Sequence, residues 1–375
     1  MHRTDAIAWV VSVCAISLRL SQAKTLAVLV ASAMRVERVS LANIGRQMLG
    51  GVKHQIKRCW RFCANERVEA ADAMRGVLKR ALRKRKRPLI VSLDWTDIKS
   101  FQTLMASVVF KGRSCPVCWS SCTKHVYDGH RSRNAFERSG IRRLPRDESL
   151  LLVLRSMVPA GQRVILLADR GFGRTELARF CQRHGFDYVI RIQPNVHVRC
   201  ASFTGKLLDY PVHKGICKLL RGVAYRSHHP VEQNIVVRWV WDLPPRRDEC
   251  WFLMSSLTAG PARISRLYGQ RMTIEELFRD HKSKRNGWSL RDTKITRADR
   301  LDRLLLILAV AYLLLCGIGL IAQQTHTPGA WSAGSRNDCS VFTIGRVMLT
   351  RLSCSTAQAL NALLAATDEA VPKWG

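Results

Sequence analysis

The sequence predicts a mixed α/β protein, and three features of its patterning lead to that class. The chain up to about Leu82 shows helical periodicity and contains no proline. After Pro88, short apolar runs typical of buried strands alternate with longer amphipathic stretches typical of helices. A strand-rich stretch at residues 195–256 interrupts this alternation. We therefore expect an all-α N-terminal region, an α/β core that carries a β-rich insertion, and helices at the C-terminal end.

Beyond residue 20, three helices are expected in the N-terminal region, at residues 22–36, from the N-cap Ser40 to about Gly50, and at residues 52–67. Short helices joined by tight turns are typical of a helix-turn-helix DNA reader. The third helix carries cations that could contact phosphates or base edges: Lys53, His54, Lys57, Arg58 and Arg61. A small helical bundle with a solvated basic face explains the same pattern. The run KRALRKRKR at residues 79–87 reads either as a linker lying along a phosphate backbone or as a solvated run.

The fold of the core is predicted from the order of its elements. Strands are expected at residues 89–94, 103–110, 115–122, 164–169 and 186–192, with helices at 147–157, capped by Asp147, and at 175–184. Three strands, a helix, a strand, a helix and a strand is the order of an RNase H-like fold. In that fold the first and fourth strands lie side by side. We therefore expect Asp94 and Asp169 to be close together.

This order divides the chain into four parts. We expect a helical DNA-binding region at residues 1–87, a catalytic core at 88–194 and 257–322, a β-rich insertion at 195–256, and a C-terminal helical region at 323–375. The last part is predicted to hold a loop at 326–338 and one or two helices within 341–365.

Two apolar segments raise the question of a membrane. Residues 6–18 could pass as a signal-peptide core, but no convincing cleavage site follows, and a first buried helix is preferred. Residues 304–322 carry no charge and are long enough to span a bilayer. We expect a helix buried inside the core there, because the chain before it is highly basic.

The balance of charge indicates a polyanionic partner. The chain has 61 Lys and Arg against 28 Asp and Glu, a net charge of +33 and a pI near 10.6. Nucleic acid is the usual partner of such a protein, and an acidic membrane surface is the competing one. The 13 cysteines form no regular framework, which favours reduced thiols in a cytosol. Cys115 and Cys118 form a single CxxC, where buried thiols are preferred to a zinc site.

The stretch YGQRMTIEELFRDHK at residues 268–282 concentrates charge on one face of a predicted helix. At about 100° per residue, four side chains share one narrow stripe: Tyr268, Arg271, Glu275 and Lys282. Glu276 points elsewhere, so Glu275 is the carboxylate of interest. Taken alone, such a stripe is usually a surface helix with ordinary charge pairs.

The spacing of these four residues resembles the Y-(2)-R-(3)-E-(6)-K signature of bacterial DDE transposases of the insertion-sequence-four type, and all four positions match. The resemblance covers about residues 88–322 and extends loosely to the N-terminal region. It implies DNA transposition, in which the protein binds the terminal inverted repeats of an insertion sequence, cleaves phosphodiester bonds and joins the freed ends to target DNA. The implied partners are the double-stranded DNA of the ends and target and a second copy of the chain, in the bacterial cytoplasm, at the nucleoid when DNA-bound, and without a membrane.

The resemblance implies that Asp94, Asp169 and Glu275 are the catalytic and metal-binding residues. Three carboxylates in a small space repel one another unless cations hold them, so the cluster suits Mg²⁺ or Mn²⁺. Two ions would serve the attacking and the leaving oxygen. Asp97 competes with Asp94 for the first position. Strand alternation puts the two on opposite faces, and Thr96 follows Asp94 as the family pattern requires.

Four residues are candidates for binding DNA. By the resemblance, Tyr268, Arg271 and Lys282 would hold phosphates near the cleaved bond, and Trp251 would stack on an extruded base. Core packing explains Trp251 equally well. The alternatives for the whole chain are an RNase H-like nuclease, an inactive DNA-binding relative and, more distantly, a basic protein anchored in a membrane by residues 304–322.

Overall fold

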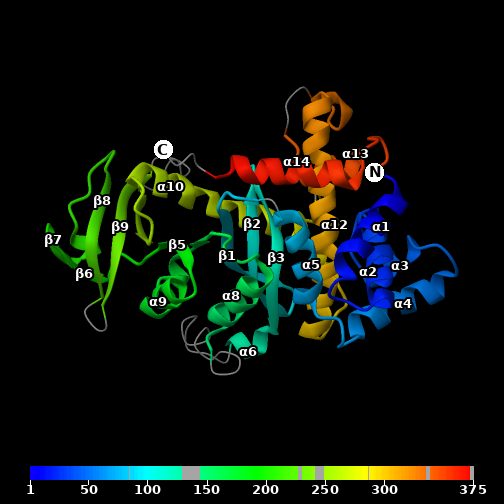
Figure 1. Cartoon of the computed structure of the whole chain (residues 1–375), viewed down its shortest axis with the longest axis horizontal. Coiled ribbons are helices and arrows are strands. Elements are labelled where there is room, and N and C mark those ends of the chain that lie inside the picture. The colour runs from blue at the N-terminus through cyan, green and yellow to red at the C-terminus, as the bar shows by residue number, and fades with distance from the viewer. Residues whose placement is uncertain are drawn as a thin grey trace.

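The computed structural model describes the chain except residues 84, 129–143, 227–229, 241–248, 286, 335–337 and 372–375. Three groups of elements lie side by side in Figure 1: the insertion strands at one end, a central sheet with its covering helices, and the N-terminal helices at the other end. Helix α12 (Ala298–Thr325) runs between the central sheet and the N-terminal helices.

The described strands form one ten-stranded mixed sheet in the order β3-β2-β1-β4-β5-β10-β9-β8-β6-β7. The strands are β1 (Leu89–Ile98), β2 (Phe101–Phe110), β3 (Arg113–Thr123), β4 (Val164–Ala168), β5 (Phe186–Arg191), β6 (His197–Cys200), β7 (Phe203–Lys206), β8 (Cys217–Tyr225), β9 (Val231–Val240) and β10 (Glu249–Ser255). The prediction of a mixed α/β fold is confirmed. β1 pairs antiparallel with β2 and parallel with β4, and β4 pairs parallel with β5, as the predicted core order requires.

The two central strands are apolar because both of their faces are covered. Every residue from Leu89 to Leu93 and from Val164 to Ala168 is buried. Near-continuous apolar runs of this kind are typical of parallel strands between two layers of helices. The register pairs Leu93 with Ala168, so the residues that follow them in the two strands reach the same edge of the sheet.

The insertion strands extend the core sheet instead of forming a separate one. β10 pairs antiparallel with β5 on one side and with β9 on the other. β6 and β7 form a short hairpin at the far edge that the sequence patterning did not resolve. The insertion and the core are therefore joined by continuous backbone hydrogen bonding.

Five helices make up the N-terminal region: α1 (Arg3–Cys14), α2 (Leu20–Ala33), α3 (Leu41–Arg46), α4 (Val52–Ala64) and α5 (Ala70–Leu82). Ser40 caps α3 as expected, since its hydroxyl accepts a hydrogen bond from Asn43 N at 3.0 Å. α4 ends three residues before the predicted boundary, and α5 had no predicted counterpart of its own. Most of the basic run at residues 79–87 is the end of α5 and the turn after it, with Lys84 outside the described residues.

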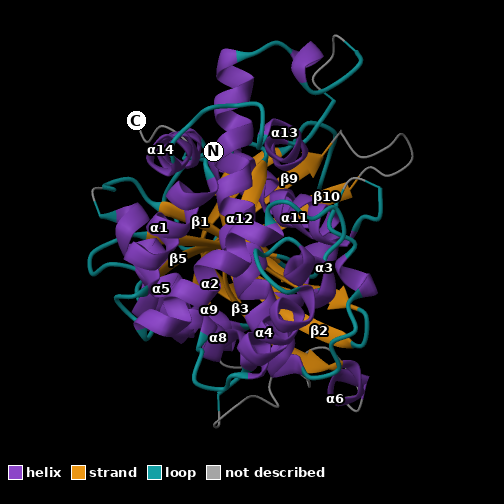
Figure 2. Ribbon diagram, turned by 90° about the vertical axis from the view of Figure 1, so that its right-hand side faces the viewer, coloured by secondary structure: helices purple, strands orange, loops and turns teal. Residues whose placement is uncertain are grey.

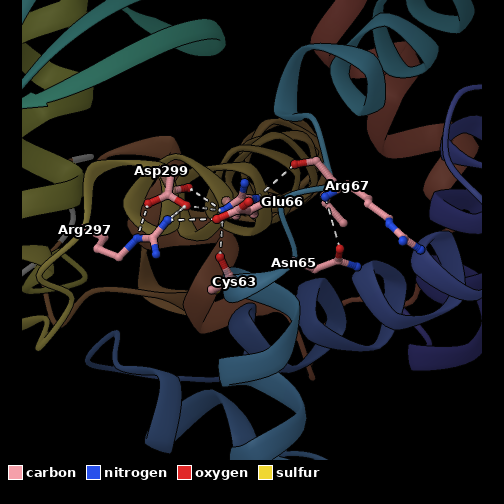
Figure 3. A network of polar contacts seen from close by, with 8 residues as sticks. Cys63, Asn65, Glu66, Arg67, Arg297 and Asp299 are labelled. Atoms are coloured by element: carbon pink, nitrogen blue, oxygen red, sulfur yellow. Dashed lines mark hydrogen bonds and ion pairs between the residues drawn. The ribbon is translucent and has the colours of Figure 1, made fainter.

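A polar network ties this region to the start of α12 (Figure 3). Arg297 contacts Glu66 at 3.0 Å and Asp299 at 2.9 Å, while Arg303 donates to the Cys63 carbonyl at 3.0 Å. Arg303 is buried, and it also donates a hydrogen bond to the carbonyl oxygen of Val68. This bond gives a buried backbone acceptor its partner. The N-terminal helices therefore share one hydrophobic core with α12.

Helix α12 is long and apolar enough to cross a membrane by composition, yet 94% of its most apolar stretch is buried inside the fold. The helices α13 (Val341–Met348) and α14 (Thr356–Glu369) pack across it. The approach is close enough to require glycine: a Cβ at Gly317 would lie 2.4 Å from the Ala359 carbonyl oxygen. This burial supports the predicted core helix.

The remaining described helices are α6 (Lys124–Asp128), α8 (Arg146–Met157), α9 (Thr175–Arg183), α10 (Pro261–Gly269) and α11 (Thr273–Lys282). Two predictions were wrong in detail. Asp147 does not cap α8, because it lies in the first turn and its buried carboxylate pairs with Arg174. The single helix expected at residues 268–282 is divided by a 3₁₀ turn at Gln270–Met272, whose tighter backbone begins with ψ of −13° at Gln270.

Candidate active site

Asp94 and Asp169 lie next to each other at the same edge of the sheet. Asp94 is in β1 one residue beyond Leu93, and Asp169 directly follows β4 one residue beyond Ala168. Neighbouring strands are about 4.8 Å apart, so the two residues are adjacent. Asp169 also caps the 3₁₀ turn Arg170–Phe172, accepting a hydrogen bond from Gly171 N at 2.9 Å. The predicted juxtaposition of the first and fourth strands is what places both carboxylates here.

Arg271 links Asp94 to Glu275. Its Nη1 lies 3.1 Å from Asp94 Oδ2, and its Nη2 lies 2.6 Å from Glu275 Oε1. The Arg271 side chain is only 10% exposed, whereas that of Glu275 is 43% exposed. Burial disfavours the Arg271 charge, but Tyr268, Asp94 and Glu275 outweigh it, and the pKa of Arg271 is raised. The guanidinium therefore stays charged between the two carboxylates.

A depression of about 350 Å³ opens beside this pair, lined by Asp94, Trp95, Thr96, Asp97, Gln102, Glu275, Phe278 and Lys282. Lys282 donates to Thr96 Oγ1 at 2.9 Å, which fixes the end of α11 against β1. Burial, then Arg291, lowers the pKa of Lys282. Asp97 borders the same depression and contacts Lys124 at 3.6 Å. Strand alternation therefore does not separate Asp97 from the site.

Tyr268 and Trp251, two of the residues expected to bind DNA, contact each other. Their rings meet edge to face with centroids 4.9 Å apart. Tyr268 is buried, which raises its pKa to about 12, while Trp251 is half-buried at the edge of the core. In this structure Trp251 packs against Tyr268, in line with the alternative of core packing.

Arg191 is a charged neighbour of the site that the sequence patterning did not single out. It is the last residue of β5, the third strand of the parallel group, and therefore reaches the same sheet edge as Asp94 and Asp169. Burial lowers its pKa, and Tyr268, Arg170, Arg271 and Asp169 are its charged or titratable neighbours. A basic residue ending a strand beside two strands that end in aspartate was the available signal.

Helix α11 is anchored to its surroundings through Asp280. This buried carboxylate accepts hydrogen bonds from the Tyr312 hydroxyl at 2.8 Å and from the Ser340 hydroxyl at 3.3 Å, and Arg113 Nε lies 3.6 Å away. These partners come from α12, the N-cap of α13 and β3; Figure 2 shows α11 beside α12 and below α13. Burial raises the pKa of Asp280, and Arg113 opposes that effect. Asp280 thus joins the helix that carries Glu275 to three other elements.

Charge pairs and ring stacking make further contacts to α11. Glu276 pairs with both Arg113 and Arg279 at 2.8 Å, pointing away from Asp94 as the helical stripe predicted. His281 stacks on Trp288 at 5.7 Å, and its burial lowers its pKa to about 3, so the imidazole is neutral. Together with the contacts of Asp280, these contacts determine where Glu275 lies.

The donor set suits a divalent cation with oxygen ligands, because carboxylates from β1, β4 and α11 face one edge of the sheet. Among the described residues, no three His, Cys, Asp or Glu side chains are close enough together to surround one ion. Arg271 lies between two of the expected ligands. A cation bound by both Asp94 and Glu275 would take the position that the guanidinium now holds.

Residues 85–314, more than half of the chain, match the family described as the transposase DDE domain. The chain belongs to the DDE transposase family. The transposase is therefore an enzyme of DNA transposition, a polynucleotidyl transferase and endonuclease that acts on DNA and is of the kind insertion sequences encode. Members of this family generally use divalent metal ions. A search of curated proteins finds no match to the transposase.

The matched residues begin just before β1 and end inside α12. They contain all three candidate carboxylates and the whole stretch from Tyr268 to Lys282. Family membership weighs against the membrane-anchored alternative. The N-terminal helices α1 to α5 lie almost entirely outside the match, so it bears on the core of the transposase alone.

Proposed function

We propose that the protein is a cut-and-paste transposase of the insertion-sequence-four type, which binds terminal inverted repeats, cleaves at the element ends and joins them to target DNA. The carrying observation is the contact of Arg271 with both Asp94 and Glu275 beside Asp169. The spacing from Tyr268 to Lys282 supports the finer assignment, since all four signature positions are filled.

In this proposal Asp94, Asp169 and Glu275 are the catalytic residues and the ligands of two Mg²⁺ or Mn²⁺ ions. When bound, such ions activate a water or a 3′-hydroxyl and stabilise the leaving oxygen of the scissile phosphate. The protein supplies rigid placement: two carboxylates on paired strands and a third on an anchored helix. The half-exposed side chain of Glu275 is the ligand with the most freedom to adjust.

Four further residues are proposed to bind the DNA end. Lys282 lines the depression, and Arg271 contacts Asp94 and Glu275, which also line it, so a phosphate there could replace the present partners of both cations. Tyr268 is a buried neighbour of Arg271. Trp251, packed on Tyr268, would reach an extruded base only after a rearrangement, so its DNA role is the least supported of the four.

The four predicted parts of the chain are kept as a functional division: residues 1–87 for DNA recognition, 88–194 with 257–322 for catalysis, and 195–256 and 323–375 as appended elements. On α4 the side chains of Lys53, His54, Lys57 and Arg61 are exposed, as a recognition surface requires, whereas Arg58 is partly buried against Thr25. Pairing of two element ends would require a homodimer. The place of action would be the bacterial cytoplasm, at the nucleoid.

The test is a cleavage and strand-transfer assay on a DNA duplex that carries the ends of the element, with Mg²⁺ or Mn²⁺. Cleavage followed by joining of the freed 3′ ends to a second duplex is the expected result. Cleavage without joining under any metal would favour an RNase H-like nuclease. Binding without cleavage would indicate an inactive relative, and the cut-and-paste proposal would be withdrawn in either case.

A further inference from the structure

We infer that the insertion carries a second phosphate-binding site, which holds the DNA backbone beyond the scissile bond. The site is a groove of about 230 Å³, called the basic groove below, lined by His197, Val198, Arg199, Thr204, Ala224, Arg226 and Pro230. This inference rests on the proposed function, because it assumes that DNA occupies the carboxylate site.

The strand register gathers cations on the face that forms the groove. His197 lies directly opposite Lys206 in the β6–β7 hairpin, and Arg199 lies opposite Thr204. Residues directly opposite each other, or two apart on one strand, share a face of the sheet. His197, Arg199 and Lys206 are all exposed. They therefore form one basic surface on this face of the sheet, with His197 and Arg199 lining the groove and Lys206 beside them.

The opposing charge on this face is small. Arg199 also pairs with Ala224 of β8, and Ala224 pairs in turn with Glu232 of β9, an acid on the same face. No described residue that lines the groove itself is acidic. Arg199, Lys206 and Arg226 therefore leave a positive balance, which an anion of the size of a phosphate would neutralise.

Arg226 joins the groove to the catalytic edge of the sheet. Its Nη2 donates to the Gly173 carbonyl at 3.3 Å, and the neighbouring Tyr225 hydroxyl donates to the same oxygen at 2.8 Å. Gly173 ends the 3₁₀ turn that Asp169 begins. The groove is therefore built against the turn that positions the second carboxylate.

The backbone of Arg226 is strained, which is unusual for a residue without a special role. Its φ is +68°, in the left-handed region that favours glycine and is unfavourable for other residues. Among the described residues its buried Nε has no hydrogen-bond partner. A guanidinium has five donors, so Arg226 can hold Gly173 and a phosphate oxygen together.

Two hydrogen bonds join the lining of the groove to the core. Arg179 of α9 donates to the Pro230 carbonyl at 3.3 Å, and Arg226 donates to the Gly173 carbonyl at 3.3 Å. The groove is thus lined by the insertion and attached to the segment after Asp169. A DNA strand that leaves the carboxylates along this side would bring its backbone to Arg199 and Lys206.

The experiment compares DNA binding by the full-length protein and by the double variant Arg199→Gln/Lys206→Gln, using a duplex that carries the element end. Fluorescence anisotropy gives Kd across a series of salt concentrations. Both residues are exposed, so the variant should fold like the parent, and its melting temperature checks this. We expect Kd to rise roughly five- to tenfold, and the slope of log Kd against log salt to fall by about 1 to 2, because each lost phosphate contact removes about 0.9.

The matched control is Lys111→Gln/Arg351→Gln, which removes the same charge from exposed positions away from the groove. Its slope should remain close to that of the parent. Equal changes in both double variants would overturn the inference, because net charge alone would explain them, and so would a groove variant that binds like the parent. A parent that cuts and joins DNA while the groove variant binds normally would refute the groove and leave the proposed function standing. A parent that binds no DNA would refute both.

Discussion

Arg271 is the side chain that connects strand β1 to helix α11 at the candidate site. The sequence predicted its contact with Glu275, because residues four apart on a helix are neighbours. It did not predict the contact with Asp94, since that depends on how α11 packs against the sheet. The same limit explains Asp97. Strand alternation predicted that Asp94 and Asp97 lie on opposite faces, but both aspartates border one depression at the twisted edge of the sheet.

Replacing Arg271 by Lys should reduce metal-dependent DNA cleavage by roughly 100-fold, because a single ammonium cannot contact two carboxylates and a phosphate with the geometry of a guanidinium. Single-turnover cleavage measures this. Arg279→Lys is the control, since Arg279 is on the same helix but 70% exposed and paired with Glu276. Parent-like cleavage by the Arg271 variant would remove this residue from the site.

The buried carboxyl group of Asp302 predicts how the stability of the fold depends on pH. Burial raises its pKa to about 7 from the ordinary 3.8, although Ser121 N donates to it at 3.4 Å. Between these values the unfolded chain has lost the proton that the folded chain keeps. The stability linked to this group is therefore complete below pH 3.8 and falls until about pH 7.

Asp302→Asn should therefore raise the melting temperature more at pH 8 than at pH 5. The free energy of unfolding should increase by at most roughly 4 kcal/mol at the higher pH. Thermal unfolding at both values measures it. Asp299→Asn should act in the opposite direction at pH 8, because Arg297 lowers the pKa of Asp299 to about 2. An equal effect of the Asp302 substitution at both pH values would contradict the burial of an ionised group.

At the scale of elements, the strands and helices of the core could be predicted because each carries its own pattern. β1, β4 and β5 contain apolar runs followed by Asp94, Asp169 and Arg191, and α12 is apolar on all sides from Leu304 onwards. What the sequence could not supply is the reason why α11 is held in place. From the sequence alone, Asp280 would be placed on the solvent-facing side of a helix. Its contacts with Tyr312 of α12 and Ser340 before α13 depend on long-range packing. The division of the expected helix at Gln270–Met272 is likewise a result of packing.

Asp280→Ala should lower the free energy of unfolding by about 3 kcal/mol, because it leaves Arg113 and Tyr312 without their buried partner. DNA cleavage should fall as well, since the position of Glu275 depends on α11. Denaturant unfolding and cleavage of the element end measure the two effects. Ser340→Ala removes only the 3.3 Å bond and should cost about 1 kcal/mol. Cleavage that is unchanged in the Asp280 variant would show that α11 is held by other contacts.

At the scale of the whole molecule, the net charge of +33 is divided between distant surfaces. Helix α4, which carries exposed cations, lies at one end of the molecule in Figure 1, and the strands that line the basic groove, β6 to β8, lie at the other, with β1 of the carboxylate site between them. Composition predicted a polyanionic partner but could not place these surfaces. Nor could it show that the insertion strands continue the core sheet, because pairing of β10 with β5 is a long-range contact.

The central claim is that Asp94, Asp169 and Glu275 act together as the site of DNA cleavage. The most direct test compares Glu275→Gln with Glu276→Gln in Mg²⁺-dependent cleavage of the element end, with DNA binding measured in parallel. These neighbouring glutamates are on one helix; Glu275 pairs with Arg271, which also contacts Asp94, while Glu276 pairs with Arg113 and Arg279. We predict that cleavage is lost in the Glu275 variant and kept in the Glu276 variant, with DNA bound by both. Cleavage that persists without the Glu275 carboxylate would contradict the claim.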